Sequence, residues 1–262
     1  EVAVDLGTWE AAVEGVDPAT TATLLADVCR RWAGDPGPEA ERSARVAVAL
    51  DAAMAGAGAV AGTVNCHGPW FRGSERVGIT ACLAVACQAE LGRSIACTGD
   101  QPTAIALHLA RLIAGSALYC EGYAPEAETG LLLVAAGGEG DPAWADPPDA
   151  VTLEANDHYP GVHGKGTGLS FDLRRGPATL ISLSPTGAGW TLAWATGEIA
   201  ESRYDAMRGP NGMFRFDSGP AVEVIDGWIA SGATHHNALA PGRLDIEVPA
   251  LASALGLRPV RI

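Results

Sequence analysis

Hydrophobic residues in the first 115 positions follow two patterns in turn: the spacing of amphipathic helices and the short apolar runs of buried strands. A helix is predicted to begin at the Asp17-Pro18 pair, because Asp caps helix N-termini and Pro suits the first turn. The predicted helices cover residues 18–32, 39–57, 78–91 and 102–114, and the predicted strands cover residues 60–66 and 94–98. Strands that alternate with helices of this length predict a parallel, layered α/β sheet.

From about residue 116 the pattern changes to short strand-forming runs separated by Gly and Pro turns. The predicted strands cover residues 118–123, 131–136, 151–154, 168–173, 178–184, 189–196 and 221–224. Short helices are predicted directly after His235-His236 and over residues 249–255. The expected fold class is therefore α/β plus β. A layered, Rossmann-like parallel α/β domain covers residues 1–115, and a mostly antiparallel β-rich domain with a few helices covers residues 116–262.

The charge and the cysteines narrow the class of protein. The chain carries 31 acidic and 17 basic side chains, a formal net charge of −14, which argues against nucleic acid or anionic membranes as partners. No apolar run reaches the roughly 18 residues of a membrane span, and the segment that begins at Glu1 lacks the basic region of a signal peptide, so none is predicted in this chain. The missing leading Met suggests residues upstream. Six cysteines, all between Cys29 and Cys120, are expected to be buried thiols in the cytoplasm.

Polar side chains follow the predicted strands, where catalytic groups of parallel α/β sheets gather. His67 either contacts a substrate or hydrogen-bonds its own loop, and Trp70 stacks on a sugar ring or belongs to a pocket wall. Asp100 is either a catalytic carboxylate or the N-cap of the helix over residues 102–114. Glu121 lies within an apolar strand, where a carboxylate is costly unless it binds something.

The densest polar cluster of the chain is the Gly-rich segment 154–166. Asp157, His158, His163 and Lys165 in it are candidates for substrate contacts, metal binding or acid–base work, since such loops let side chains converge on a ligand. The alternative is a turn-rich connection whose histidines hydrogen-bond to the backbone.

Two further candidates lie nearer the C-terminus. The adjacent imidazoles of His235 and His236 are expected to serve a site, because neighbouring histidines rarely serve packing. Arg215, in the polar loop 207–217, either contacts a hydroxyl-rich or anionic ligand or is an ordinary surface residue.

Six segments, taken in order, resemble motifs of the L-fucose and L-arabinose isomerase superfamily. They are residues 63–67 (TVNCH), 96–100 (ACTGD), 119–123 (YCEGY), 133–140 (LVAAGGEG), 175–180 (RGPATL) and 231–236 (SGATHH). The resemblance covers nearly the whole chain and implies the central and C-terminal domains of such an enzyme. It also implies a homo-oligomer, a trimer or hexamer. The family's N-terminal Rossmann-like domain is absent from the chain, which leaves open a separate partner chain that supplies it.

The resemblance implies roles for particular residues. Glu121 matches a catalytic carboxylate that also binds the metal, and His235 or His236 matches a metal-binding imidazole. Thr98 stands where the family places a second Glu, and Ala136 where arabinose-type members place another His. A two-ligand remnant of the metal site is expected from these exchanges. Asp100 is the candidate to replace the missing carboxylate.

The predicted function is metal-dependent aldose–ketose isomerisation through an enediol, with Mn²⁺ as the expected cofactor at an altered site. Two carboxylates beside a divalent metal suit this reaction, because one removes a proton from carbon and the other returns one. The alternative is a diverged member that binds a polyol or carries out different chemistry. The substrate is a sugar or polyol in either case.

Overall fold

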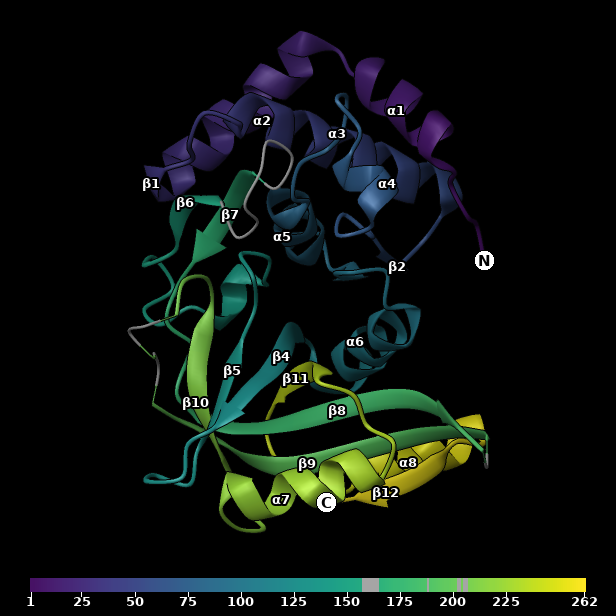
Figure 1. The fold of residues 1–262 in the computed structure, drawn as a ribbon, viewed down its shortest axis with the longest axis vertical. Coiled ribbons are helices and arrows are strands. Elements are labelled where there is room, and N and C mark those ends of the chain that lie inside the picture. The colour runs from purple at the N-terminus through teal and green to yellow at the C-terminus, as the bar shows by residue number, and fades with distance from the viewer. Residues whose placement is uncertain (157–164, 188, 202–203, 205–206) are drawn as a thin grey trace.

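A computed structural model describes residues 1–156, 165–187, 189–201, 204 and 207–262 of the chain. Most helices gather in one half and most strands in the other (Figure 1). The helices are α1 (Leu6–Glu14), α2 (Pro18–Arg31), α3 (Ala40–Ala57), α4 (Pro69–Arg72), α5 (Cys82–Glu90), α6 (Gln101–Ala114), α7 (Ala221–Ala230) and α8 (Glu247–Leu255), with a 3-10 turn at Pro142–Trp144. The strands are β1 (Ala33–Asp35), β2 (Ala61–Thr63), β3 (Ser94–Ala96), β4 (Leu118–Pro125), β5 (Leu132–Ala135), β6 (Thr152–Asn156), β7 (Gly166–Ser170), β8 (Gly176–Thr186), β9 (Gly189–Glu201), β10 (Asn211–Phe216), β11 (His236–Pro241) and β12 (Arg258–Arg261).

The β half is a closed antiparallel barrel. Its six described strands pair in the order β10-β5-β4-β11-β8-β9, and pairing of β9 with β10 closes the ring. β9 spans 13 residues and pairs with two strands: residues 189–199 pair with β8, and residues 197–201 at its C-terminal end pair with β10. β12 adds to β9 in parallel. The prediction of mostly antiparallel strands in this part of the chain is confirmed.

Three elements of the β half differ from their predictions. Residues 221–224 are not a strand but the first turn of α7, because Ala221, Val224 and Trp228 recur at helical spacing and are buried on one side. The residues after His235 form β11 rather than a helix, since they pair with both β4 and β8. The predicted polar loop 207–217 contains β10.

A layered parallel α/β sheet in the first half is not confirmed. The parallel pairings there are short: β2 with β3, and β1 with β6, three residues each. β6 then pairs antiparallel with β7, so strands from beyond residue 115 sit among the N-terminal helices. The helix predictions are confirmed for α2, α3, α5 and α6, but three-residue strands give a helix-rich half rather than a wide sheet. None of the described helices has the length and apolar character to cross a membrane.

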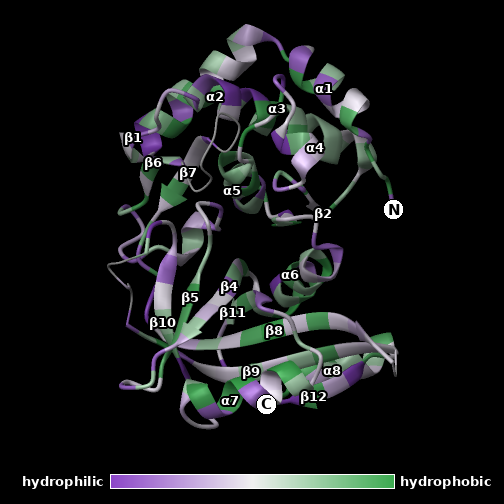
Figure 2. Cartoon of the chain, viewed as in Figure 1, coloured by the Kyte–Doolittle hydropathy of each residue, from purple (hydrophilic) through white to green (hydrophobic). Residues whose placement is uncertain are grey.

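Helix α6 joins the two halves by packing on the barrel. Alternate residues of β8 belong to different buried clusters, because successive strand side chains point to opposite faces. Ile181 and Leu183 pack in one cluster with Leu107 of α6, whereas Leu180 packs in another with Phe214 of β10. Figure 2 shows that α6 and β8 are rich in hydrophobic residues, whereas the outer helix α2 carries more hydrophilic ones. This packing holds the ends of β2 and β3 against the barrel.

Candidate functional site

A cavity of about 640 Å³ lies where the ends of β2, β3 and α5 face the ends of β4, β5 and β11. The elements come from both halves of the molecule (Figure 1). Its lining residues are His67, Thr80, Cys82, Cys97, Thr98, Glu121, Tyr123, Gly137, Glu139, Asn156, Met207, Arg208, His235 and His236. The cavity therefore brings together residues that are up to 169 positions apart in the sequence, from His67 to His236.

The barrel places Glu121 and His236 side by side. They are directly opposed partners in the antiparallel pair of β4 and β11, so their side chains share one face of the sheet. Nε2 of His236 lies 3.9 Å from Oε1 of Glu121. The hydroxyl of Tyr119, two residues earlier on the same face, donates a hydrogen bond of 3.1 Å to that same oxygen. Burial raises the pKa of Tyr119, so the phenol keeps its proton and remains a donor.

Asp100 contacts both the N-terminus of helix α6 and the imidazole of His236. Its Oδ1 accepts a hydrogen bond of 2.9 Å from the backbone N–H of Thr103, which confirms Asp100 as the N-cap of α6. Its Oδ2 lies 2.7 Å from Nδ1 of His236. Burial by itself would raise the pKa of Asp100, but the hydrogen bonds with His236 and Thr103 outweigh burial and hold this pKa below its usual value. The carboxylate can only accept, so Nδ1 carries a proton, and Nε2 is the nitrogen that faces Glu121.

The donor atoms fit a divalent metal ion. One ligand atom each from Glu121, His235 and His236 lie within 4.8 Å of one another. The expected two-ligand remnant is thus a three-ligand set, because both histidines converge on the carboxylate. Two imidazoles and one carboxylate suit Mn²⁺ or another first-row divalent ion, with positions left for substrate oxygens. The half-buried Asp100 behind His236 gives the carboxylate–histidine arrangement found behind metal-binding histidines.

No protein-family model matches this chain, and no curated protein matches it significantly. What the chain can do has to be inferred from the cavity and from the groups that line it.

Glu139 is a second carboxyl group of the cavity, and it is almost fully buried, with 2% of its surface exposed. Burial raises its pKa, and the nearby Glu121 charge acts in the same direction. The thiol of Cys82 lies 3.5 Å from Oε2 of Glu139, and Nδ2 of Asn156 donates to the Cys82 sulfur at 3.1 Å. Glu139 and Glu121 are therefore two carboxyl groups in different surroundings, which is the arrangement that separates an acid from a base.

Thr98 has a strained backbone at the edge of the cavity. Its φ of 58° lies in the left-handed region, which β-branched residues rarely adopt, and it is the only described non-glycine residue with a positive φ. Its buried Oγ1 has no hydrogen-bond partner among the described residues. Strain and an unsatisfied hydroxyl at one residue are typical of functional sites. The other exchanged position, Ala136, is fully buried beside β5 and contributes no ligand.

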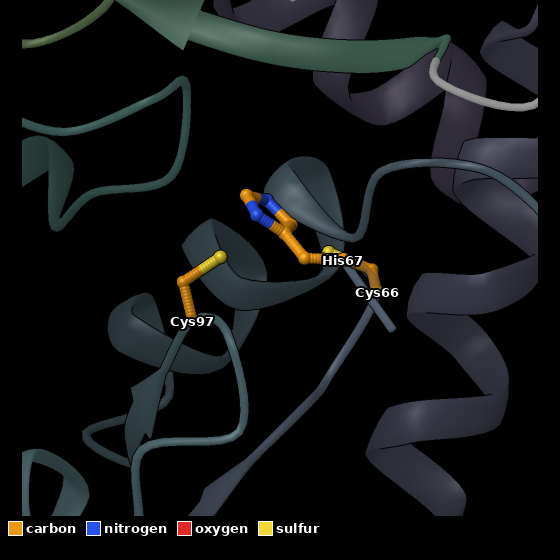
Figure 3. Close-up of side chains that lie close together, drawn as sticks. All are labelled: Cys66, His67 and Cys97. Carbon is orange, nitrogen blue, oxygen red and sulfur yellow. The ribbon is translucent and has the colours of Figure 1, made fainter. Parts of the chain in front are cut away.

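A group of sulfur and nitrogen atoms lies at the helical side of the cavity: Cys66, His67 and Cys97 (Figure 3). Hydrogen bonding from Cys97 lowers the pKa of the Cys66 thiol well below its usual value; burial opposes this and His67 adds to it. The hydrogen bond to Cys66 and burial raise the pKa of Cys97. The hydrogen bond with Cys66 also raises the pKa of His67, although burial opposes it.

Other predicted site residues lie outside the described cavity lining. Trp70 is exposed in α4 beside Phe71, and Arg215 forms a 2.7 Å surface ion pair with Glu198. Lys165 is exposed, and its carbonyl accepts a hydrogen bond from the Thr80 backbone. The structure thus joins His67, Thr98, Glu121, His235 and His236 at the cavity, with Asp100 behind. The remaining candidates, Asp157, His158 and His163, lie outside the described residues.

Sequence reasoning missed several groups of the cavity. Glu139, Arg208 and Asn156 line it, and none was singled out as a site residue. A signal existed for Glu139, because it directly follows a strand in the segment 133–140 that carries the family resemblance. Asn156 and Arg208 lie in the polar segments 154–166 and 207–217, but tertiary contacts decide that these two residues reach the cavity: Asn156 ends β6, which pairs with β1 and β7, and Arg208 precedes β10 of the barrel.

Proposed function

We propose that this protein is a metal-dependent isomerase that interconverts an aldose and a ketose. The observation that carries the proposal is the convergence of Glu121, His235 and His236 on one point of the cavity, with Asp100 hydrogen-bonded behind His236. The resemblance to L-fucose and L-arabinose isomerases predicts Glu121 and one of the two histidines, His235 or His236, as metal ligands. A cavity of about 640 Å³ has room for a monosaccharide and several water molecules.

The metal is assigned to Glu121, His235 and His236, and Mn²⁺ is the ion expected there. When bound, it would act as a Lewis acid on neighbouring substrate oxygens. Asp100 holds Nδ1 of His236 and so keeps the Nε2 lone pair directed toward Glu121. Tyr119 donates to Oε1 of Glu121 and so orients this carboxylate.

The proton transfers are assigned to two carboxyl groups. The carboxylate of Glu121 removes the proton from the carbon beside the carbonyl, and the electron pair of that C–H bond forms the double bond of an enediol. The π electron pair of the carbonyl moves to its oxygen at the same time, and that oxygen takes up a proton from water. A proton then returns to the former carbonyl carbon, while the hydroxyl proton on the other carbon is lost to give the ketone. Glu139 is the group that supplies the returning proton, because its burial favours the protonated form.

A second candidate function follows from the two exchanged positions. Thr98 and Ala136 stand where the resemblance predicts a carboxylate and an imidazole, so a site that binds a polyol without isomerising it is the competing proposal. Polyol binding of this kind would not depend on metal, because hydroxyl groups need only hydrogen-bond donors and acceptors.

The test is a screen of aldoses in D₂O with Mn²⁺ and with EDTA. The isomerase proposal predicts deuterium uptake at the carbon beside the carbonyl, lost with EDTA and restored by Mn²⁺. Glu121→Gln should reduce the exchange by roughly 10²–10⁴-fold, since it removes the base. Glu198→Gln is the matched control, because Glu198 pairs with Arg215 on the surface. Sugar binding that is insensitive to EDTA, without exchange, would favour the polyol-binding proposal instead.

A further inference from the structure

Cys66, His67 and Cys97 form a compact group that the proposed isomerase chemistry does not use. One ligand atom from each side chain lies within 4.8 Å of the other two. Figure 3 shows the Cys97 side chain directed toward Cys66 and His67. Both cysteines are buried, and His67 is half-buried. The sulfur and nitrogen atoms are therefore held together by the fold rather than gathered by chance on the surface.

The fold brings these residues together through two parallel strands. Thr63 at the end of β2 pairs with Ala96 at the end of β3. The Thr63 hydroxyl donates to the Ala96 carbonyl at 3.0 Å, and the Val64 N–H donates to the same carbonyl at 3.3 Å. Cys97 is the next residue after β3, and a turn closed by Gly68 N–H to the Asn65 carbonyl carries Cys66 and His67. Neighbouring strand ends thus fix the separation of the ligand atoms.

We propose that Cys66, His67 and Cys97 bind a thiophilic divalent cation of the Zn²⁺ type, as a second metal centre in the same cavity. Two sulfurs and one imidazole are ligands that Zn²⁺ prefers, whereas Mn²⁺ prefers oxygen. Binding forms two metal–sulfur bonds and one metal–nitrogen bond, and both sulfurs bind as thiolates whose protons go to solvent. The centre is independent of the ligands Glu121, His235 and His236, so it stands whether or not the chain is an isomerase.

The position of the group implies an open metal site. Cys97 and His67 line the cavity, so a bound ion would face the space where a small ligand sits. Among the described residues the group holds three ligands, and a zinc ion with three protein ligands keeps its fourth position for water or substrate. The nearby Cys82 is engaged with Asn156 and Glu139. The ligand class for the fourth position is therefore water or an oxygen of the cavity's substrate.

Substitution of Co²⁺ for Zn²⁺ distinguishes this centre from the one assigned to Glu121, His235 and His236. Cobalt bound by thiolates gives an intense sulfur-to-metal charge-transfer band in the near ultraviolet, whereas cobalt bound only by carboxylate and imidazole does not. We expect the reduced protein to develop this band on Co²⁺ titration and to lose it when one equivalent of Zn²⁺ is added. Glu121→Gln should keep the band, which separates this result from the outcome of the isomerase test.

Cys97→Ser should abolish the band and lower the bound Zn²⁺ by one equivalent, whereas Cys120→Ser, a control at a buried thiol outside the group, should change neither. A second measurement needs no variant: Zn²⁺ should slow alkylation of Cys66 and Cys97, mapped by mass spectrometry, and a chelator should reverse the effect. The proposal is overturned if the reduced protein gives no charge-transfer band. Retention of the band in folded Cys97→Ser, or alkylation that Zn²⁺ leaves unchanged, would also overturn it.

Discussion

The variant Asp100→Asn separates the two contacts of this carboxylate. Asn caps helices about as well as Asp, so the hydrogen bond from Thr103 to the residue at position 100 should persist and α6 should stay intact. The contact with Nδ1 of His236 changes, because an amide cannot supply the negative charge of a carboxylate. His236 then loses the partner that holds its proton on Nδ1 and its lone pair on Nε2.

The contact of Asp100 with His236 predicts an effect on metal affinity, whereas its contact with Thr103 predicts an effect on stability. Loss of a carboxylate behind a metal-binding histidine costs roughly 10- to 100-fold in metal affinity, which corresponds to about 1.4–2.8 kcal/mol. Loss of an N-cap costs about 1 kcal/mol of stability when the replacement is Ala. Asp100→Asn should therefore weaken Mn²⁺ binding by roughly 10- to 100-fold with little change in the free energy of unfolding. Asp100→Ala should lose about the same metal affinity and about 1 kcal/mol of stability as well.

Calorimetric titration with Mn²⁺ and urea unfolding measure the two quantities separately. Asp17 provides the control, because it caps α2 through Thr20 at 3.1 Å and no described histidine contacts it. Asp17→Ala should cost about 1 kcal/mol of stability and leave Mn²⁺ affinity unchanged. Equal Mn²⁺ affinity in Asp100→Asn and the parent protein would refute the orienting role of Asp100. An equal loss of stability in the Asn and Ala variants would refute the separation of the two contacts.

Two further variants test the electrostatics and the strain of the cavity. The raised pKa of Glu139 means that the folded protein holds this proton over a pH range where the unfolded chain has lost it, so stability falls as the pH rises through that range. Glu139→Gln should remove this fall, and its stability relative to the parent should be greater at pH 8 than at pH 4 in urea unfolding; an unchanged difference would contradict the burial argument. Thr98→Gly should relieve the φ of 58° and raise the free energy of unfolding by up to about 1 kcal/mol. Thr20→Gly, inside α2, should instead lower the free energy of unfolding by a few tenths of a kcal/mol through helix propensity. A loss of stability in Thr98→Gly would mean that the Thr side chain contributes more than its backbone costs.

Helices α2, α3, α5 and α6 followed from the sequence because the interactions that form them are local. Asp17 and Asp100 each accept a hydrogen bond from an N–H three residues ahead. Asp17 was predicted as a cap, and capping was one of the two alternatives predicted for Asp100. The strands from 118 to 196 also follow from alternating or buried runs of suitable residues. The same local reasoning fails at residues 221–224, where four residues are too few to distinguish a strand from the first turn of a helix.

The site depended on contacts between residues far apart in the chain. Sequence reasoning selected Glu121, His235 and His236, because a carboxylate in an apolar strand and adjacent imidazoles are unusual. Sequence reasoning could not decide whether Asp100 is a catalytic carboxylate or an N-cap, because the contact between Asp100 and His236 spans 136 positions of the sequence. The tertiary structure confirms the N-cap and adds the contact with His236, and it also brings Glu139 into the cavity. The physical reason is that pairing of β4 with β11 and closure of the barrel by β9 and β10 set which side chains share a face, and neither pairing is encoded by local propensity.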